Sequence, residues 1–178
     1  MGRLLLDGKD VGFKFSAAHL LPGHSKCGRM HGHNYVVDVA IEKETNENGM
    51  IVDFIEVKKD IREFLNQHLD HKLLIAGAAP DMEFEQVNWS KEEQYNPDDG
   101  PIKSLIIRTV FGKEYTIPKM DIAFLSGWGE IKHITAEELV VWMKNRIYWE
   151  FAPVWGLKST EQLQLILYED DGQGVGTE

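Results

Sequence analysis

The chain has 178 residues, of which 43% are hydrophobic and 27% charged, with one cysteine and a formal net charge of −10. These values are typical of a single globular domain large enough to bury a core, and one cysteine excludes an intrachain disulfide. The negative charge disfavours general nucleic-acid binding, and no apolar run is long enough to span a bilayer. We therefore expect a cytoplasmic protein with no nucleic-acid or membrane partner.

Two β-strands are predicted near the start of the chain. The first covers residues 13–19, and a Gly/Pro/Ser-rich loop over 20–30 separates it from the second, which begins at His31 and continues through β-branched and aromatic residues. Because this loop reverses the direction of the chain, the two strands are expected to pair antiparallel. Because alternate residues of a strand share a face, His31 and His33 point to the same side.

Two imidazoles on one strand face form a metal chelate, and His19, at the end of the neighbouring strand, is the best third ligand. Three neutral imidazoles favour Zn²⁺ and leave its fourth position open, as in catalytic zinc sites. Cys27 fits two roles, either a fourth ligand that closes a structural site or a free thiol acting as base or nucleophile. His24 is an alternative ligand in place of His19, but it is interpreted as an ordinary loop residue.

A first helix is expected after these strands. A turn over residues 44–49 leads to a short buried strand over 50–53, and an N-cap motif then opens an amphipathic helix over 54–67. Asp70 and His71 follow the helix, and a carboxylate beside an imidazole can orient it where the geometry allows.

Residues 76–134 are interpreted as an insertion that decorates a smaller core. The stretch 76–101 is acidic and loop-like, whereas 104–110 and 113–118 are predicted to form a β-hairpin. The stretch 118–132 is expected to be irregular.

The last part of the chain predicts a helix and a strand. Thr135 and Glu138 form a capping box before a second amphipathic helix that ends near Glu150. The strand over 161–169 alternates with period two, which places Glu169 on the same face as three leucines. That carboxylate is either a partly buried hydrogen-bond acceptor or the point where the strand reaches water.

Together these motifs resemble the 6-pyruvoyl-tetrahydropterin synthase superfamily. The spacing of Cys27 and His31 is similar to that of its 6-carboxy-tetrahydropterin synthase branch, which belongs to deazapurine (queuosine) biosynthesis. The matching segments are Phe15–His19, Cys27–Tyr35, Gly49–Phe54, Leu69–His71, Thr135–Glu137 and Glu169.

The resemblance implies a role for each motif. It implies zinc held by His19, His31 and His33, with Cys27 as an unliganded general base. Asp70 and His71 would form a second acid/base unit on the other side of the substrate. Glu169 would hold the amino-pyrimidinone edge of a pterin through paired hydrogen bonds, with Thr135 and Glu137 contributing at the ring.

The resemblance also implies a fold and an assembly. The implied fold is α+β, a four-stranded antiparallel sheet with two helices on one face (the tunnelling fold). The whole of residues 1–178 would form one such domain, with the insertion between the helices and a mobile tail over 170–178. Protomers of the family join into barrels, commonly homohexamers, with sites shared between subunits.

The implied reaction is that of a zinc-dependent lyase. It converts 7,8-dihydroneopterin triphosphate to 6-carboxy-tetrahydropterin and releases acetaldehyde and triphosphate. The alternatives are 6-pyruvoyl-tetrahydropterin synthesis and aldol cleavage of a dihydroneopterin. A further alternative is a non-catalytic zinc- or pterin-binding protein in which Cys27 is a ligand.

Overall fold

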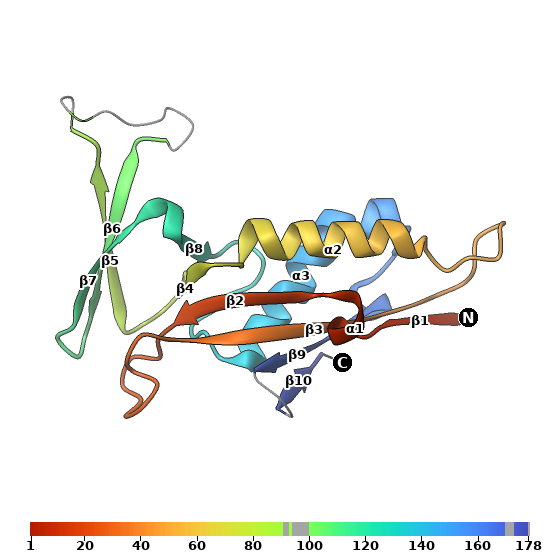
Figure 1. Ribbon diagram of the computed structural model, residues 1–178, viewed down its shortest axis with the longest axis horizontal. Coiled ribbons are helices and arrows are strands. Elements are labelled where there is room, and N and C mark those ends of the chain that lie inside the picture. The colour runs from red at the N-terminus through yellow and green to blue at the C-terminus, as the bar shows by residue number, and fades with distance from the viewer. Residues whose placement is uncertain (91–92, 94–99, 170–172, 178) are drawn as a thin grey trace.

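The computed structural model describes residues 1–90, 93, 100–169 and 173–177. Within these ranges the fold is α+β, as the sequence predicts. Helices α2 (Phe54–His68) and α3 (Ala136–Trp155) cover one face of a large sheet, and a second, smaller sheet stands at one end of the molecule (Figure 1). The hydrophobic core lies between the large sheet and the two helices.

The large sheet has seven strands, so the expected four-stranded antiparallel sheet is wrong. Its strands are β1 (Gly2–Leu6), β2 (Lys14–His19), β3 (His31–Lys43), β4 (Lys72–Ala76), β8 (Ile122–Leu125), β9 (Leu163–Glu169) and β10 (Gly174–Gly176). They run in the order β10-β9-β3-β2-β4-β8, and β1 also pairs with β3. Strand β4 is parallel to both of its neighbours, β2 and β8, and the sheet is therefore mixed.

The first long helix begins where its cap is predicted. The side chain of Asp53 accepts a hydrogen bond of 2.7 Å from the backbone N–H of Ile55, and α2 then runs to His68. Val57, Ile61, Phe64 and Leu65 enter the core, as the helical spacing predicts, whereas Phe54 in the first turn is exposed. The expected short strand over residues 50–53 is not formed, and a bend leads into the helix instead. A one-turn helix, α1 (Gly8–Val11), joins β1 to β2.

The second long helix also begins at its predicted cap. The Thr135 hydroxyl accepts from the backbone N–H of Glu138, while the Glu138 carboxylate accepts from the backbone N–H groups of Lys132 and His133. Helix α3 continues past the expected end, through Pro153, and stops at Gly156, which adopts a left-handed φ of 65°. None of the described helices is long and apolar enough to cross a membrane.

The segment between α2 and α3 is only partly separate from the large sheet. The predicted hairpin is present as β6 (Ile102–Thr109) and β7 (Glu114–Pro118), but β5 (Met82–Asn88) lies in the stretch expected to be a loop and completes a three-stranded sheet. A 3₁₀ turn over Lys119–Asp121 leads to β8, which returns to the large sheet within the stretch expected to be irregular.

Part of the tail, for which mobility is predicted, forms a strand in the structure. Residues 170–172 and 178 lie outside the described residues, but Gly174–Gly176 form β10 against β9. Thr177 extends this contact, because its backbone N–H donates to the Leu165 carbonyl at 2.8 Å. The last strand is thus hydrogen-bonded to the edge of the sheet.

Candidate metal centre and adjoining cavity

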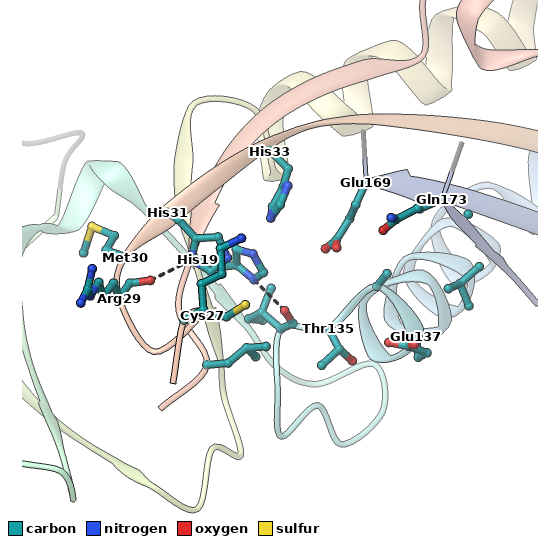
Figure 2. Close-up of a pocket in the computed structure, with 16 residues that line it drawn as sticks. His19, Cys27, Arg29, Met30, His31, His33, Thr135, Glu137, Glu169 and Gln173 are labelled. Atoms are coloured by element: carbon teal, nitrogen blue, oxygen red, sulfur yellow. Dashed lines mark hydrogen bonds between the residues drawn. The ribbon is translucent and has the colours of Figure 1, made fainter. Parts of the chain in front are cut away.

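Three histidines meet at the end of the β2–β3 pair, on the face that the helices cover. His19 is directly opposite His31 in the antiparallel register, and His33 is opposite Ala17. One ligand atom from each imidazole lies within 4.8 Å of the others, which is close enough to hold a single ion. Figure 2 shows the three rings around a common space.

Backbone carbonyls orient two of these rings. The carbonyl of Ile134 accepts a hydrogen bond from His19 Nδ1 at 2.7 Å, and that of Arg29 accepts from His31 Nδ1 at 2.7 Å. Because a carbonyl can only accept, the proton resides on Nδ1 and the Nε2 lone pair is available to a metal. His19 Nε2 is buried and has no hydrogen-bond partner. An orphaned buried nitrogen that faces two more imidazoles fits a metal ion.

Burial holds His19 in its neutral form. The residue is 3% exposed, and this desolvation lowers its pKa from 6.5 to about 4. The hydrogen bond to Ile134 opposes the shift, whereas the neighbouring His31 and His33 add to it. A neutral imidazole is the form that binds a metal, so His19 is a competent ligand at neutral pH.

A cavity of about 800 Å³ adjoins the histidines. Four further predicted site residues line it: Cys27, Thr135, Glu137 and Glu169. They come from the loop after β2, from the start of α3 and from the end of β9, and Figure 2 shows Glu169 pointing into the space next to His33. The structure therefore brings distant parts of the sequence to one cavity beside the three histidines.

Glu169 is half-buried and has a fixed partner. The hydroxyl of Tyr35, which is fully buried, donates to the Glu169 carboxylate at 3.2 Å. The two residues are opposite each other in the β3–β9 register, and Tyr35 also stacks on Phe15. Of the two sequence interpretations, the partly buried acceptor is the one that the structure supports.

Cys27 lies in the wall of the cavity but is outside the group of three ligand atoms. It belongs to a compact loop in which the Cys27 carbonyl accepts from the backbone N–H of Leu21 at 2.8 Å. The Cys27 backbone N–H donates to His24 Nδ1 at 3.0 Å. His24 thus contacts its own loop, in line with its interpretation as an ordinary loop residue.

Gln173 is a cavity residue that the sequence analysis missed. It lines the same wall as Glu169, and its carbonyl accepts from the Glu169 backbone N–H at 3.1 Å. Figure 2 shows its side chain beside that of Glu169. Its amide both donates and accepts hydrogen bonds, so it can pair with a heteroaromatic edge.

Asp70 and His71 form the expected pair, but His71 borders a different cavity. Asp70 Oδ2 lies 2.7 Å from His71 Nδ1, and the other carboxylate oxygen accepts from the Ser16 backbone N–H at 2.8 Å. His71, in a left-handed conformation with φ 57°, points into a cavity of about 510 Å³ that Ser16 and Asn34 also line. The side chains of Ser16 and Asn34 lie on the face of the β2–β3 pair opposite the three histidines. His33 borders both cavities.

A cluster of three imidazoles beside a cavity that holds a thiol and carboxylates is typical of a metal-dependent enzyme. The family described as 6-pyruvoyl tetrahydropterin synthase matches residues 10–177. The chain belongs to this enzyme family.

Individual relatives agree with this assignment. A protein from Methanocaldococcus jannaschii named putative 6-carboxy-5,6,7,8-tetrahydropterin synthase is 30% identical over 97% of this chain and 93% of its own length. A protein of the same name from Archaeoglobus fulgidus is 47% identical, but over 36% of this chain and 55% of that relative. The solved structure of Plasmodium falciparum 6-pyruvoyl tetrahydropterin synthase shares the fold, with a TM-score of 0.77, 22% identity and coverage of 99% of this chain and 96% of that one.

Proposed function

We propose that this protein is a zinc-dependent lyase that converts 7,8-dihydroneopterin triphosphate to 6-carboxy-tetrahydropterin, acetaldehyde and triphosphate. The observation that carries the proposal is the buried, unpartnered Nε2 of His19, which faces two further imidazoles at the edge of a cavity holding Cys27 and Glu169. The names of the two archaeal relatives support this branch of the family over the others.

Each group in the large cavity has a proposed role. His19, His31 and His33 hold the zinc ion, which supplies Lewis acidity toward the substrate side chain. Cys27 removes a proton from that side chain as the general base. Glu169, oriented by Tyr35, accepts two N–H bonds from the pterin ring.

Thr135 and Glu137 sit at the start of α3 and complete the proposed ring pocket. The carboxylate of Glu137 is a hydrogen-bond acceptor, and the Thr135 hydroxyl already caps the helix. Both would bind the ring side of the substrate rather than the reacting side chain.

Asp70 and His71 form the proposed second proton-transfer unit. Because His71 borders the cavity on the other face of β2 and β3, we propose that the pair acts within an assembly in which sites are shared between subunits. A homohexamer of single-domain protomers, as in the resemblance described above, would provide such sharing. Its formation is tested by mass photometry or light scattering.

The product assay tests the reaction directly. Zinc-loaded protein incubated with 7,8-dihydroneopterin triphosphate is expected to release acetaldehyde together with a carboxy-pterin. A pyruvoyl-pterin, or a hydroxymethyl-pterin from aldol cleavage, would contradict the proposal and assign one of the alternative reactions instead.

A Cys27→Ala variant tests the class of the site. As general base, Cys27 contributes about 100-fold or more to turnover, and its loss should leave the zinc content unchanged because the three histidines are intact. Loss of zinc with loss of the thiol would instead favour a closed structural Cys-His₃ site and a non-catalytic protein.

A further inference from the structure

We infer that the turn of the β6–β7 hairpin is a positioning element for Cys27, with Lys113 and Phe111 bracing the loop that carries the thiol. This inference gives the small sheet a role in the reaction, and it rests on the proposed function of Cys27 as general base. The loop between β2 and β3 and the turn between β6 and β7 lie at the same end of the molecule (Figure 1).

Lys113 contacts the loop directly beside the cysteine. Its Nζ donates a hydrogen bond of 2.5 Å to the backbone carbonyl of Gly28, the residue that follows Cys27. A charged donor on a carbonyl forms one of the stronger hydrogen bonds in proteins. The peptide group between Gly28 and Arg29, one residue beyond Cys27, is therefore tied to the turn of the β6–β7 hairpin.

Phe111 contacts the beginning of the same loop. A Cβ built on Gly23 would lie 2.8 Å from Phe111 Cζ, so the ring rests against the bare backbone of this glycine. Gly23 has a φ of 82°, a conformation that glycine adopts without strain. Gly23, Gly28, Phe111 and Lys113 together line a small cavity of about 170 Å³ between the loop and the hairpin.

The hairpin can position the loop only if it is itself fixed to the rest of the protein, and several contacts fix it. Ile107, on β6, is fully buried, and Phe84 of β5 packs edge to face against Phe124 of β8 with ring centres 5.1 Å apart. The backbone N–H of Val110, at the turn, donates to the Asp81 carbonyl at 3.0 Å. The turn is thus anchored to the same protein body as the histidine cluster.

Besides Lys113 and Phe111, His31 also contacts the loop, because its Nδ1 donates to the Arg29 carbonyl at 2.7 Å. The described backbone–backbone hydrogen bonds of the loop, such as that from Gly28 N–H to the His24 carbonyl at 2.9 Å, join loop residues to one another. Such local bonds fix the shape of a loop more than its place relative to the cavity. The geometry of proton transfer is sensitive to displacements of about 1 Å, so loss of the brace should slow the reaction.

The experiment compares Lys113→Met with the conservative variant Lys113→Arg and with Lys119→Met. Lys119 is a lysine at the other end of β7, remote from the loop, and serves as the matched control. In zinc-loaded protein we expect Lys113→Met to lower kcat about tenfold with little change in KM, and Lys113→Arg to restore it. Phe111→Ala is expected to act in the same direction.

A second readout does not depend on turnover. Cys27 is the only cysteine of the chain, so alkylation by iodoacetamide, followed by mass spectrometry, reports on this loop alone. Lys113→Met and Phe111→Ala should accelerate alkylation about threefold because a released loop opens more often, whereas Lys119→Met should not. Far-ultraviolet circular dichroism verifies that each variant is folded.

The outcomes separate this inference from the proposed function. If neither alkylation nor kcat changes in Lys113→Met and Phe111→Ala, the inference that the hairpin holds the Cys27 loop is wrong. If alkylation is faster but kcat is unchanged, the hairpin holds the loop but has no role in the reaction. If the wild-type protein does not turn over the proposed substrate, the proposed function fails, and alkylation alone then decides whether the hairpin holds the loop.

Discussion

The buried His19 predicts that the metal-free protein loses stability in acid. The unfolded chain protonates this imidazole near pH 6.5, whereas burial lowers the folded-state pKa to about 4. Between these values the unfolded state binds more protons, so stability is complete above pH 6.5 and falls as the pH decreases toward 4. From pH 7.5 to 4.5 the two pKa values correspond to a loss of about 2.5 kcal/mol.

Urea unfolding of chelator-treated protein at these two pH values measures the loss. A His19→Gln variant is the control, because its neutral amide does not titrate and should remove about 2.5 kcal/mol of the pH dependence. His31 and His33 are retained in both proteins, and the difference therefore isolates His19. Equal pH dependence in wild type and variant would refute the assignment of His19 as a buried neutral base.

Three further predictions concern other parts of the structure. Removing the Tyr35 hydroxyl with Tyr35→Phe should raise KM about tenfold, because Glu169 loses a donor that orients it; an unchanged KM in steady-state assays would contradict that role. Asp53→Ala should lower the free energy of unfolding by about 1 kcal/mol through loss of the cap on Ile55, with kcat unaffected; denaturant titration measures it. Zinc at about 100 times its dissociation constant should stabilise the wild type by about 2.7 kcal/mol and the His31→Ala variant by much less, as thermal unfolding with and without metal will show.

Local patterns in the sequence were sufficient to predict much of the candidate metal centre and its cavity. The histidine cluster was predictable because the i, i+2 spacing and the short antiparallel return both act over neighbouring residues. The helix starts at Asp53 and Thr135 were predictable for the same reason, since a cap is a bond between residues two or three apart. Glu169 reached the cavity because strand alternation continued to its last residue.

The remaining features depend on contacts that no local pattern encodes. Strands β4 and β8 are short and pair in parallel across more than 45 intervening residues, so their pairing was not visible in the sequence. Gln173 enters the cavity only because β10 pairs with β9, and a polar, glycine-rich stretch gives little sign of such pairing. The placement of Asp70 and His71 on the opposite face follows from the path of the chain after α2, which periodicity does not specify.

The two contacts of the Asp70 carboxylate limit which substitutions this protein can accept during evolution. One oxygen fixes the junction between the end of α2 and strand β2 through Ser16, and the other orients His71. The proposed chemistry and the packing of the fold thus depend on the same side chain. A lineage that altered the proposed proton-transfer pair at this position would also have to rebuild the junction. Variation in the proposed reaction is therefore more accessible at the Glu169 and Gln173 end of the cavity, where the proposed recognition uses side chains and the framework contact uses the backbone.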